Sequence, residues 1–173
     1  TVTHRNFNRI DNFSAFLTAS PAVGSWHPQL TVGVQKQWAK IEHNGETLQM
    51  DTPLFFCTLN NGIQLPYHWT LSTDINFQSK GDYQNIYMYQ NVFMMNATLT
   101  KSFLNEHLSI HLQGIDLTHG RKDGNRIYNK HMNMDVANVS DSRELRFTIR
   151  YKFNTAKSKY KGKGAATEEI KRL

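Results

Sequence analysis

The chain has 173 residues, a net charge of +6 and a mean hydropathy of -0.58. That length suits one domain, and the single cysteine, Cys57, excludes an intramolecular disulfide framework. Aromatic residues make up 12% of the chain, which argues against a disordered protein. No apolar run is long enough for a membrane-spanning helix, but a membrane β-barrel stays open, because its strands alternate apolar and polar residues.

The positive charge is concentrated near the C-terminus. Residues 155–173 hold six basic and two acidic side chains, so +4 of the net +6 lies there. A short basic stretch rich in Gly, Ala, Ser and Lys is typical of a solvated terminal segment rather than of a specific binding site. We therefore expect no nucleic-acid partner.

Apolar and polar residues alternate with a period of two along most of the chain, and no convincing amphipathic helix is visible. In chain order, the alternation predicts about seven strands, at residues 13–19, 30–38, 55–65, 69–77, 93–103, 108–112 and 145–153. With their flanking residues, the longer of these strands run to about 10 to 15 residues, whereas soluble strands are typically about 5 or 6. Their length suits tilted strands that cross a membrane in about 9 to 11 residues.

The connections alternate in length. We expect tight connections at 21–28, 65–68 and 104–106 and polar loops at 43–52, 79–85 and 118–142, of which the last is the longest. Short turns at one end and long loops at the other are typical of outer-membrane barrels. The predicted fold is therefore all-β, an antiparallel up-and-down meander that forms part of a transmembrane outer-membrane β-barrel. In the longest connection we predict a hairpin around Asp123-Gly124.

The strand at 145–153 gives the clearest assignment of faces. One face is apolar and is expected to contact lipid, while the basic residues between are expected to face the barrel interior together with polar residues of strand 69–77. The expected lipid-facing residues are Leu145, Phe147, Ile149, Tyr151 and Phe153. The expected lumen-facing residues are Arg146, Arg150, Lys152, Asp74 and Asn76.

Aromatic residues gather at the ends of the predicted strands. Trp26, Tyr67, Trp69 and Phe103 lie beside the short connections, and other aromatic residues lie toward the long ones. Two levels of amphipathic rings are what the two membrane interfaces select. The sequence therefore predicts an aromatic girdle, although aromatic residues that cap a soluble core would give a similar pattern.

Several segments carry a resemblance to a known family. They are the strand and tail at 142–165 with the ending Lys171-Arg172-Leu173, and the upstream segments Gly24-Ser25-Trp26, Thr52-Pro53, 65–71 and 99–104. Taken in order, they resemble the C-terminal part of Bacteroidetes outer-membrane β-barrel proteins related to TonB-dependent receptors.

The resemblance implies the organisation and partners of the chain. It implies a C-terminal barrel segment at 1–154, a basic periplasmic tail at 155–173, and a missing N-terminal barrel and plug. The complete protein would take up an unidentified nutrient, with the lipid bilayer, the TonB system and the barrel-assembly machinery as partners. Tyr151 and Phe153 match the aromatic pattern of a terminal strand that serves as an assembly signal.

One alternative to this function remains at the level of sequence. A soluble secreted β-sandwich that binds carbohydrate or protein through its loops would alternate in the same way. An enzyme is not expected, because the usual catalytic and nucleotide-binding motifs are absent. No cofactor or metal site is expected either: His107 and His111 would lie about 13 Å apart on a strand, too far to share an ion.

Overall fold

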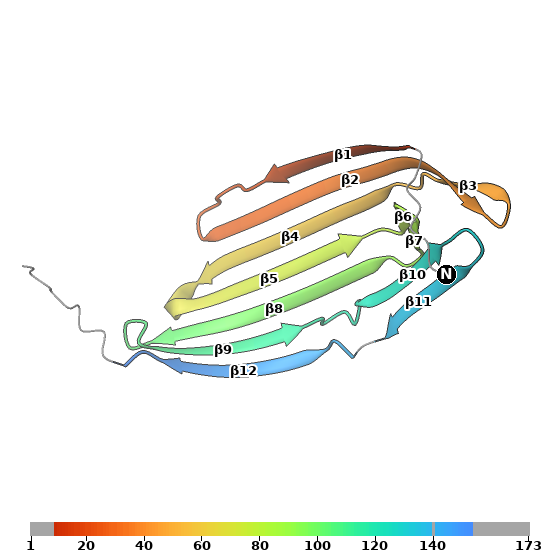
Figure 1. Cartoon of the computed structure of the whole chain (residues 1–173). Helices are drawn as coiled ribbons and strands as arrows, with labels where there is room; N and C mark the ends of the chain where they lie inside the picture. Colours follow the sequence, from red (N-terminus) through yellow and green to blue (C-terminus); the bar gives the residue numbers. More distant parts are fainter. Residues whose placement is uncertain (1–8, 140, 154–173) are drawn as a thin grey trace, which may run out of the picture.

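Seven strands form one continuous antiparallel path in the computed structural model, which describes residues 9–139 and 141–153. Figure 1 shows these long strands side by side in chain order, and no helix among the described residues is long and apolar enough to cross a membrane. The prediction of an all-β antiparallel meander is therefore confirmed. The seven strands are β1 (Ile10–Ala19), β2 (Trp26–His43), β4 (Leu54–Leu65), β5 (Trp69–Gln78), β8 (Val92–Phe103), β9 (Leu108–Ile115) and β12 (Glu144–Tyr151).

One end of this main sheet is closed by tight connections. The strands β4 and β5 are joined by a short 3-10 turn, η1 (Pro66–His68), and β8 and β9 by four residues. In the second turn Leu104, Asn105 and Glu106 all have left-handed backbone, with φ of 52°, 52° and 66°. Such φ values are unfavourable for residues with a Cβ, so this tight reversal is held by the pairing of the two flanking strands.

The connections at the opposite end contain strands of their own. A hairpin extends β2 into β3 (Glu46–Met50) through Asn44 and Gly45, whose φ values of 51° and 85° suit the turns that join antiparallel strands. A separate four-stranded sheet, which we call the loop sheet, has the order β11-β10-β7-β6 and lies at the same end (Figure 1). Its strands are β6 (Gly81–Tyr83), β7 (Ile86–Met88), β10 (Lys122–Tyr128) and β11 (Asn133–Val139).

The predicted hairpin in the longest connection exists, but its predicted turn is wrong. Asp123 and Gly124 lie inside β10, and the chain reverses at 129–132, where the Asn129 N–H donates to the Met132 carbonyl at 3.0 Å. Gly124 is needed for another reason. A Cβ at this position would lie 2.5 Å from the Tyr89 ring, so the glycine allows close packing rather than a turn.

An ion pair joins the two strands of this hairpin. The Arg126 guanidinium donates to both carboxylate oxygens of Asp135, at 2.6 and 3.0 Å. These hydrogen bonds hold the pKa of the Asp135 carboxyl below its ordinary value. Because both side chains are largely exposed, we expect the pair to fix the register of the hairpin more than its stability.

A cluster of buried apolar residues lies where β2, β3 and the loop sheet meet. Ala39, Ile41 and Met50 form this cluster, and Tyr87 and Tyr128 of the loop sheet pack against it. Nearby, the Gln37 side chain makes two hydrogen bonds with the backbone of Gln84, one donated at 2.8 Å and one accepted at 2.6 Å. The loop sheet is therefore attached to the main sheet by a small apolar core and by the two hydrogen bonds between Gln37 and Gln84.

Asp116 organises the connection that follows β9. Its carboxylate is 1% exposed and accepts hydrogen bonds from the backbone N–H groups of Gly120, at 2.8 Å, and Arg121, at 3.2 Å. It also accepts a hydrogen bond from the hydroxyl of Ser142, which lies just before β12. One carboxylate thus ties both ends of the long connection together.

Replacing Asp116 with alanine is expected to loosen this connection. The change leaves the partly buried N–H donors without their carboxylate acceptor, so the free energy of local opening should fall by about 2 kcal/mol, roughly a 30-fold loss of hydrogen-exchange protection at Gly120 and Arg121. Asp141→Ala is the matched control, because Asp141 is exposed and only receives a long bond of 3.4 Å from the Arg143 N–H. Equal protection in both variants would contradict the role given to Asp116.

Candidate functional site

The strand register collects the alternating apolar residues on one face of the main sheet. Following the pairing from β2 to β12, each partner on this line is apolar: Trp26, Ile63, Leu71, Leu99, Leu112 and Phe147. Other lines on this face are also apolar, with Leu17 of β1 opposite Val32 and Val32 opposite Cys57, although the line from Pro28 includes Asn61 and Thr73. Residues that pair across strands share a face. We call this surface the apolar face, and the opposite surface the polar face.

The apolar face is open to its surroundings. Leu17 is 69% exposed, Phe147 62% and Leu145 76%, although all three are large hydrophobic residues. In a β-sandwich these side chains would interdigitate with a second sheet. Across residues 9–139 and 141–153 no second sheet covers them, because the loop sheet contacts β2 and β4 at one end only. An exposed apolar surface of this extent marks contact with a membrane or another apolar partner.

Aromatic residues border the apolar face at its short-turn end. Trp26 begins β2, Trp69 begins β5, Phe103 ends β8, and Tyr67 lies in the turn η1. The Lys101 ammonium lies 5.1 Å from the centre of the Trp69 ring and 5.4 Å from that of Phe103, and it donates to the Tyr67 carbonyl. The four predicted girdle residues thus lie at one end of the sheet. A lysine that bends from an apolar surface toward its rim is typical of a membrane interface.

A second aromatic row borders the apolar face at the long-loop end. Phe77 pairs with Phe93, and Trp38 lies at the same end of β2, with the Lys36 ammonium 5.1 Å from its ring centre. Sequence reasoning missed both lysines, because Lys36 and Lys101 break the apolar alternation and read as irregularities. Their contacts with tryptophan at opposite ends of the sheet explain why charge is placed there.

The two rows are separated by about the thickness of a membrane. Trp26 lies at the short-turn end of β2, and following its paired residues from strand to strand leads to Phe147 on β12. Phe147 lies four residues before Tyr151, which is at the short-turn end of β12. A shift of four residues over five strand spacings corresponds to a strand tilt of roughly 30°. Phe93 and Phe103 are ten residues apart, about 33 Å along the strand and roughly 29 Å along the tilted axis. Outer-membrane barrels have an apolar band of about 25 Å between aromatic girdles.

The predicted residues of the last strand divide between the two faces. Leu145, Phe147, Ile149 and Tyr151 pair with β9 on the apolar face, where Ile149 lies opposite Ile110. Phe153 follows the strand and is 82% exposed, and its ring contacts that of Tyr151 at 4.6 Å between centroids. Arg146 and Arg150 pair on the polar face, with Gln113 and Ser109. Lys152 lies just beyond the strand, where its N–H donates to the His107 carbonyl.

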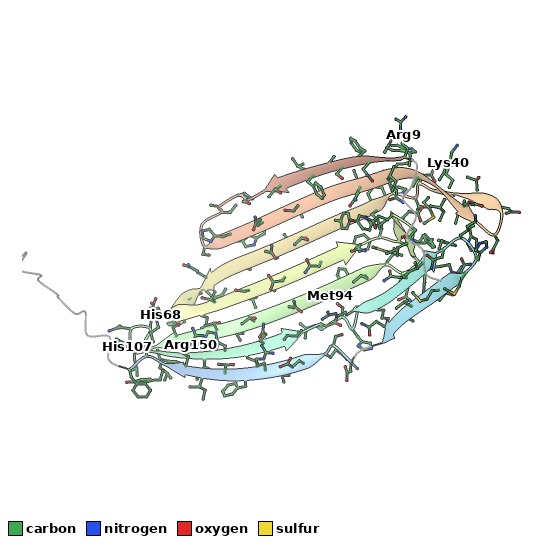
Figure 2. The ribbon with its side chains drawn as sticks, in the orientation of Figure 1. Arg9, Lys40, His68, Met94, His107 and Arg150 are labelled. Atoms are coloured by element: carbon green, nitrogen blue, oxygen red, sulfur yellow. The ribbon has the colours of Figure 1, made fainter. Side chains whose placement is uncertain are left out.

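Polar side chains predominate on the polar face, and they bond to one another within strands and across them. The Arg146 guanidinium donates to Glu144, at 3.0 and 3.1 Å, and to Gln113, at 3.4 Å. Asn76 accepts a hydrogen bond from the Thr58 hydroxyl at 3.2 Å, and Asp74 lies opposite Asn60 and Asn96. Figure 2 shows Arg150 at the short-turn end of this wall. A surface of this composition can line water or bind a polar domain.

The polar face is not uniformly polar, since it also carries Phe16 of β1, Phe56 of β4 and Met94 of β8. Phe16 of β1 lies on this face, because it pairs with Gly33, and its ring contacts that of Phe56 at 6.5 Å between centroids. A Cβ on Gly33 would come within 2.2 Å of the Phe16 ring, so the glycine makes room for it. Packing of an aromatic ring over a strand glycine stabilises such a site. The alternation at 13–19 concealed this residue, since its neighbours fit the opposite face.

These two surfaces define a class of protein. A meander of long tilted strands, with one exposed apolar face bordered by aromatic residues and one polar face, is the wall of a membrane β-barrel. The model of the outer membrane protein beta-barrel family matches residues 1–151, so the chain belongs to that family. It is accordingly an outer-membrane protein that associates with the lipid bilayer. No curated protein and no solved structure matches the chain.

The family and the open apolar face decide between the two functions that the sequence left. A soluble β-sandwich is not supported, because its apolar face would be covered. The predicted periplasmic tail at 155–173 lies outside the described residues.

Proposed function

We propose that the chain forms the C-terminal wall of a larger barrel related to TonB-dependent receptors, which takes up a nutrient across the outer membrane. In this proposal the apolar face contacts lipid and the polar face lines the substrate path or holds a plug. The observation that carries the proposal is the division of the sheet into these two faces between aromatic rows. Arg146, Arg150, Lys152, Asp74 and Asn76 then face the interior.

The edges of the main sheet support the larger barrel. Both β1 and β12 run toward the short-turn end, and among the described residues each pairs along one side only. Joining them would therefore create a parallel seam, whereas the strands of outer-membrane barrels are antiparallel. We infer that additional strands, which run in the opposite direction at both edges, complete the barrel.

The proposal assigns no catalytic role to the chain. Its polar side chains bond to one another at separate places along the polar face and are not gathered at one reactive group. The partners are the lipid bilayer, the TonB system that energises uptake, and the barrel-assembly machinery. Tyr151, at the end of β12, and Phe153, two residues beyond it, would present the aromatic assembly signal.

Comparing the solutes that cells remove from their medium tests this function. Cells that lack the gene should fail to deplete one class of solute, and the same class should remain when TonB is deleted instead. The physical reason is that a plugged barrel conducts its substrate only when energy moves the plug. A deletion strain that depletes every solute normally, or a solute whose uptake persists without TonB, would contradict the proposal.

A further inference from the structure

A cavity opens at the long-loop end of β1, β2 and β3. It has a volume of about 380 Å³ and is lined by Arg9, Asp11, Trp38, Ala39, Lys40 and Gln49. Asp11 pairs with Trp38, and Lys40 pairs with Gln49, so these side chains continue the line of the apolar face. Figure 2 shows Arg9 and Lys40 projecting together at this end of the sheet. The cavity therefore lies at the outer aromatic row, where the apolar face ends.

Cations outnumber carboxylates around this cavity. Arg9 and Lys40 line it, and the Lys36 ammonium lies over the Trp38 ring. Of the carboxylates, Asp11 is held by Arg9 at 2.9 Å, and Asp51 accepts a hydrogen bond from Gln49 at 2.8 Å. Farther along β2, Glu42 forms an ion pair with Lys130 at 3.2 Å. The cavity thus carries a net positive charge beside a tryptophan ring.

This combination suits a ligand that is anionic at one end and apolar at the other. Ammonium and guanidinium groups bind phosphate oxygens by charge-assisted hydrogen bonds. Below the cavity the apolar face continues through Val34 and Ala15, which pair with each other. A free phosphate would use only the cations, whereas a phosphate-bearing lipid would use the cations and the apolar strip together.

We propose that this cavity binds the phosphate group of an outer-leaflet membrane lipid, with the acyl chain against Val34 and Ala15. The inference rests on the proposed function, since it requires the apolar face to contact the bilayer. Lysine and arginine residues near a membrane surface favour anionic lipids, and tryptophan residues are enriched at the same depth, the membrane–water interface. The bound lipid would fix the depth of β1 and β2 in the membrane.

A fluorescence experiment measures this preference at the site. The chain, within its assembled barrel purified from the outer membrane, carries a fluorophore at Ala15→Cys in a Cys57→Ser background. It is placed in vesicles that contain either brominated phosphatidylcholine or brominated phosphatidic acid, whose bromine atoms quench the fluorophore. We expect the phosphatidic acid to associate about tenfold more strongly than the phosphatidylcholine.

Variants of three lysines test whether the cavity causes the preference for phosphatidic acid. Lys36→Gln with Lys40→Gln should reduce it to less than twofold and leave the Arg9 and Asp11 pair intact. Lys101→Gln is the matched control, because Lys101 contacts tryptophan on the same face at the opposite end, and it should keep the full preference. Heat-modifiable gel migration confirms that each variant is folded.

Each other outcome has a separate meaning. Equal quenching by the two lipids, or a preference that survives in the double variant, would overturn the lipid site and leave the membrane orientation standing. Loss of the preference on addition of inorganic phosphate would assign the cavity to free phosphate and overturn the lipid proposal. Absence of quenching by either lipid would show that Ala15 does not face the bilayer, and the proposed function would fail with it.

Discussion

Replacing Leu99 with arginine is expected to lower the free energy of unfolding in the membrane by about 2–4 kcal/mol. Leu99 lies on the apolar face of β8, near the middle of the interval between Phe93 and Phe103. An arginine there would leave water for hydrocarbon without a partner. Equilibrium unfolding in lipid vesicles measures the loss, and the amount of assembled barrel in the outer membrane should fall with it.

The neighbouring residue provides the control for this prediction. Thr98 lies on the polar face and pairs with Ser72 and Gln113, both polar. Thr98→Arg should therefore change the free energy of unfolding by less than about 0.5 kcal/mol, because the new charge remains in water. If the two arginine variants unfold alike, the two faces do not differ in their surroundings, and the assignment of lipid to the apolar face is wrong.

The 173-residue chain alone is expected to form neither a stable monomer in a bilayer nor a pore. Along the free sides of β1 and β12 the backbone groups have no strand partner in the described part of the chain. Each unsatisfied group in hydrocarbon costs several kcal/mol, so an open sheet aggregates, or pairs through its edges, rather than spanning the bilayer. Reconstitution followed by gel migration with and without heating, and by conductance recording, tests this.

The direction of the edge strands sharpens this expectation. Because β1 and β12 point the same way, neither one chain nor a pair of similarly inserted copies can close without parallel seams. Co-expression with the proposed additional barrel strands should restore heat-modifiable migration. A monodisperse, heat-modifiable monomer with a stable conductance would show that the chain closes a barrel by itself, and the proposal of a larger barrel would fall.

The main sheet could be predicted from sequence because one physical rule governs it. Membrane-crossing strands must place apolar residues on alternate positions over their whole length, as 69–77 and 145–153 do. The seven predicted segments correspond to the seven strands of the path, although β2 runs farther, to His43. Alternation also predicts that Arg146 and Arg150 share one face, because successive side chains of a strand point to opposite faces of the sheet.

The structure at the long-loop end could not be predicted in the same way. The strands β6 and β7 have three residues each, too few to show a period, and they exist because they pair within the loop sheet. The buried cluster at Ala39 and Ile41 was missed because the apolar residues of β2 change face after Trp38. This switch of the apolar residues to the other face could have been recognised in the sequence, since it marks the point where β2 extends beyond the apolar face.

The sequence contains two similar turn-forming pairs that have different roles in the structure. Asn44-Gly45 is a strong hairpin pair, and it would have predicted β3 within the connection that was treated as a loop. Asp123-Gly124 carries a similar signal, but its glycine accommodates Tyr89 instead. Local turn chemistry cannot distinguish these cases, because tertiary packing decides which glycine is needed for which purpose.

Cysteine accessibility along β5 in intact outer membranes tests the central claim most directly. Single cysteines at residues 70–77, in a Cys57→Ser background, are exposed to a small charged thiol reagent that reacts only in water. The two-faced wall predicts reaction at Ser72, Asp74 and Asn76, and protection at Leu71, Thr73 and Ile75. Reaction at the second set with protection of the first, or reactivity without alternation, would contradict a sheet that separates lipid from a polar interior.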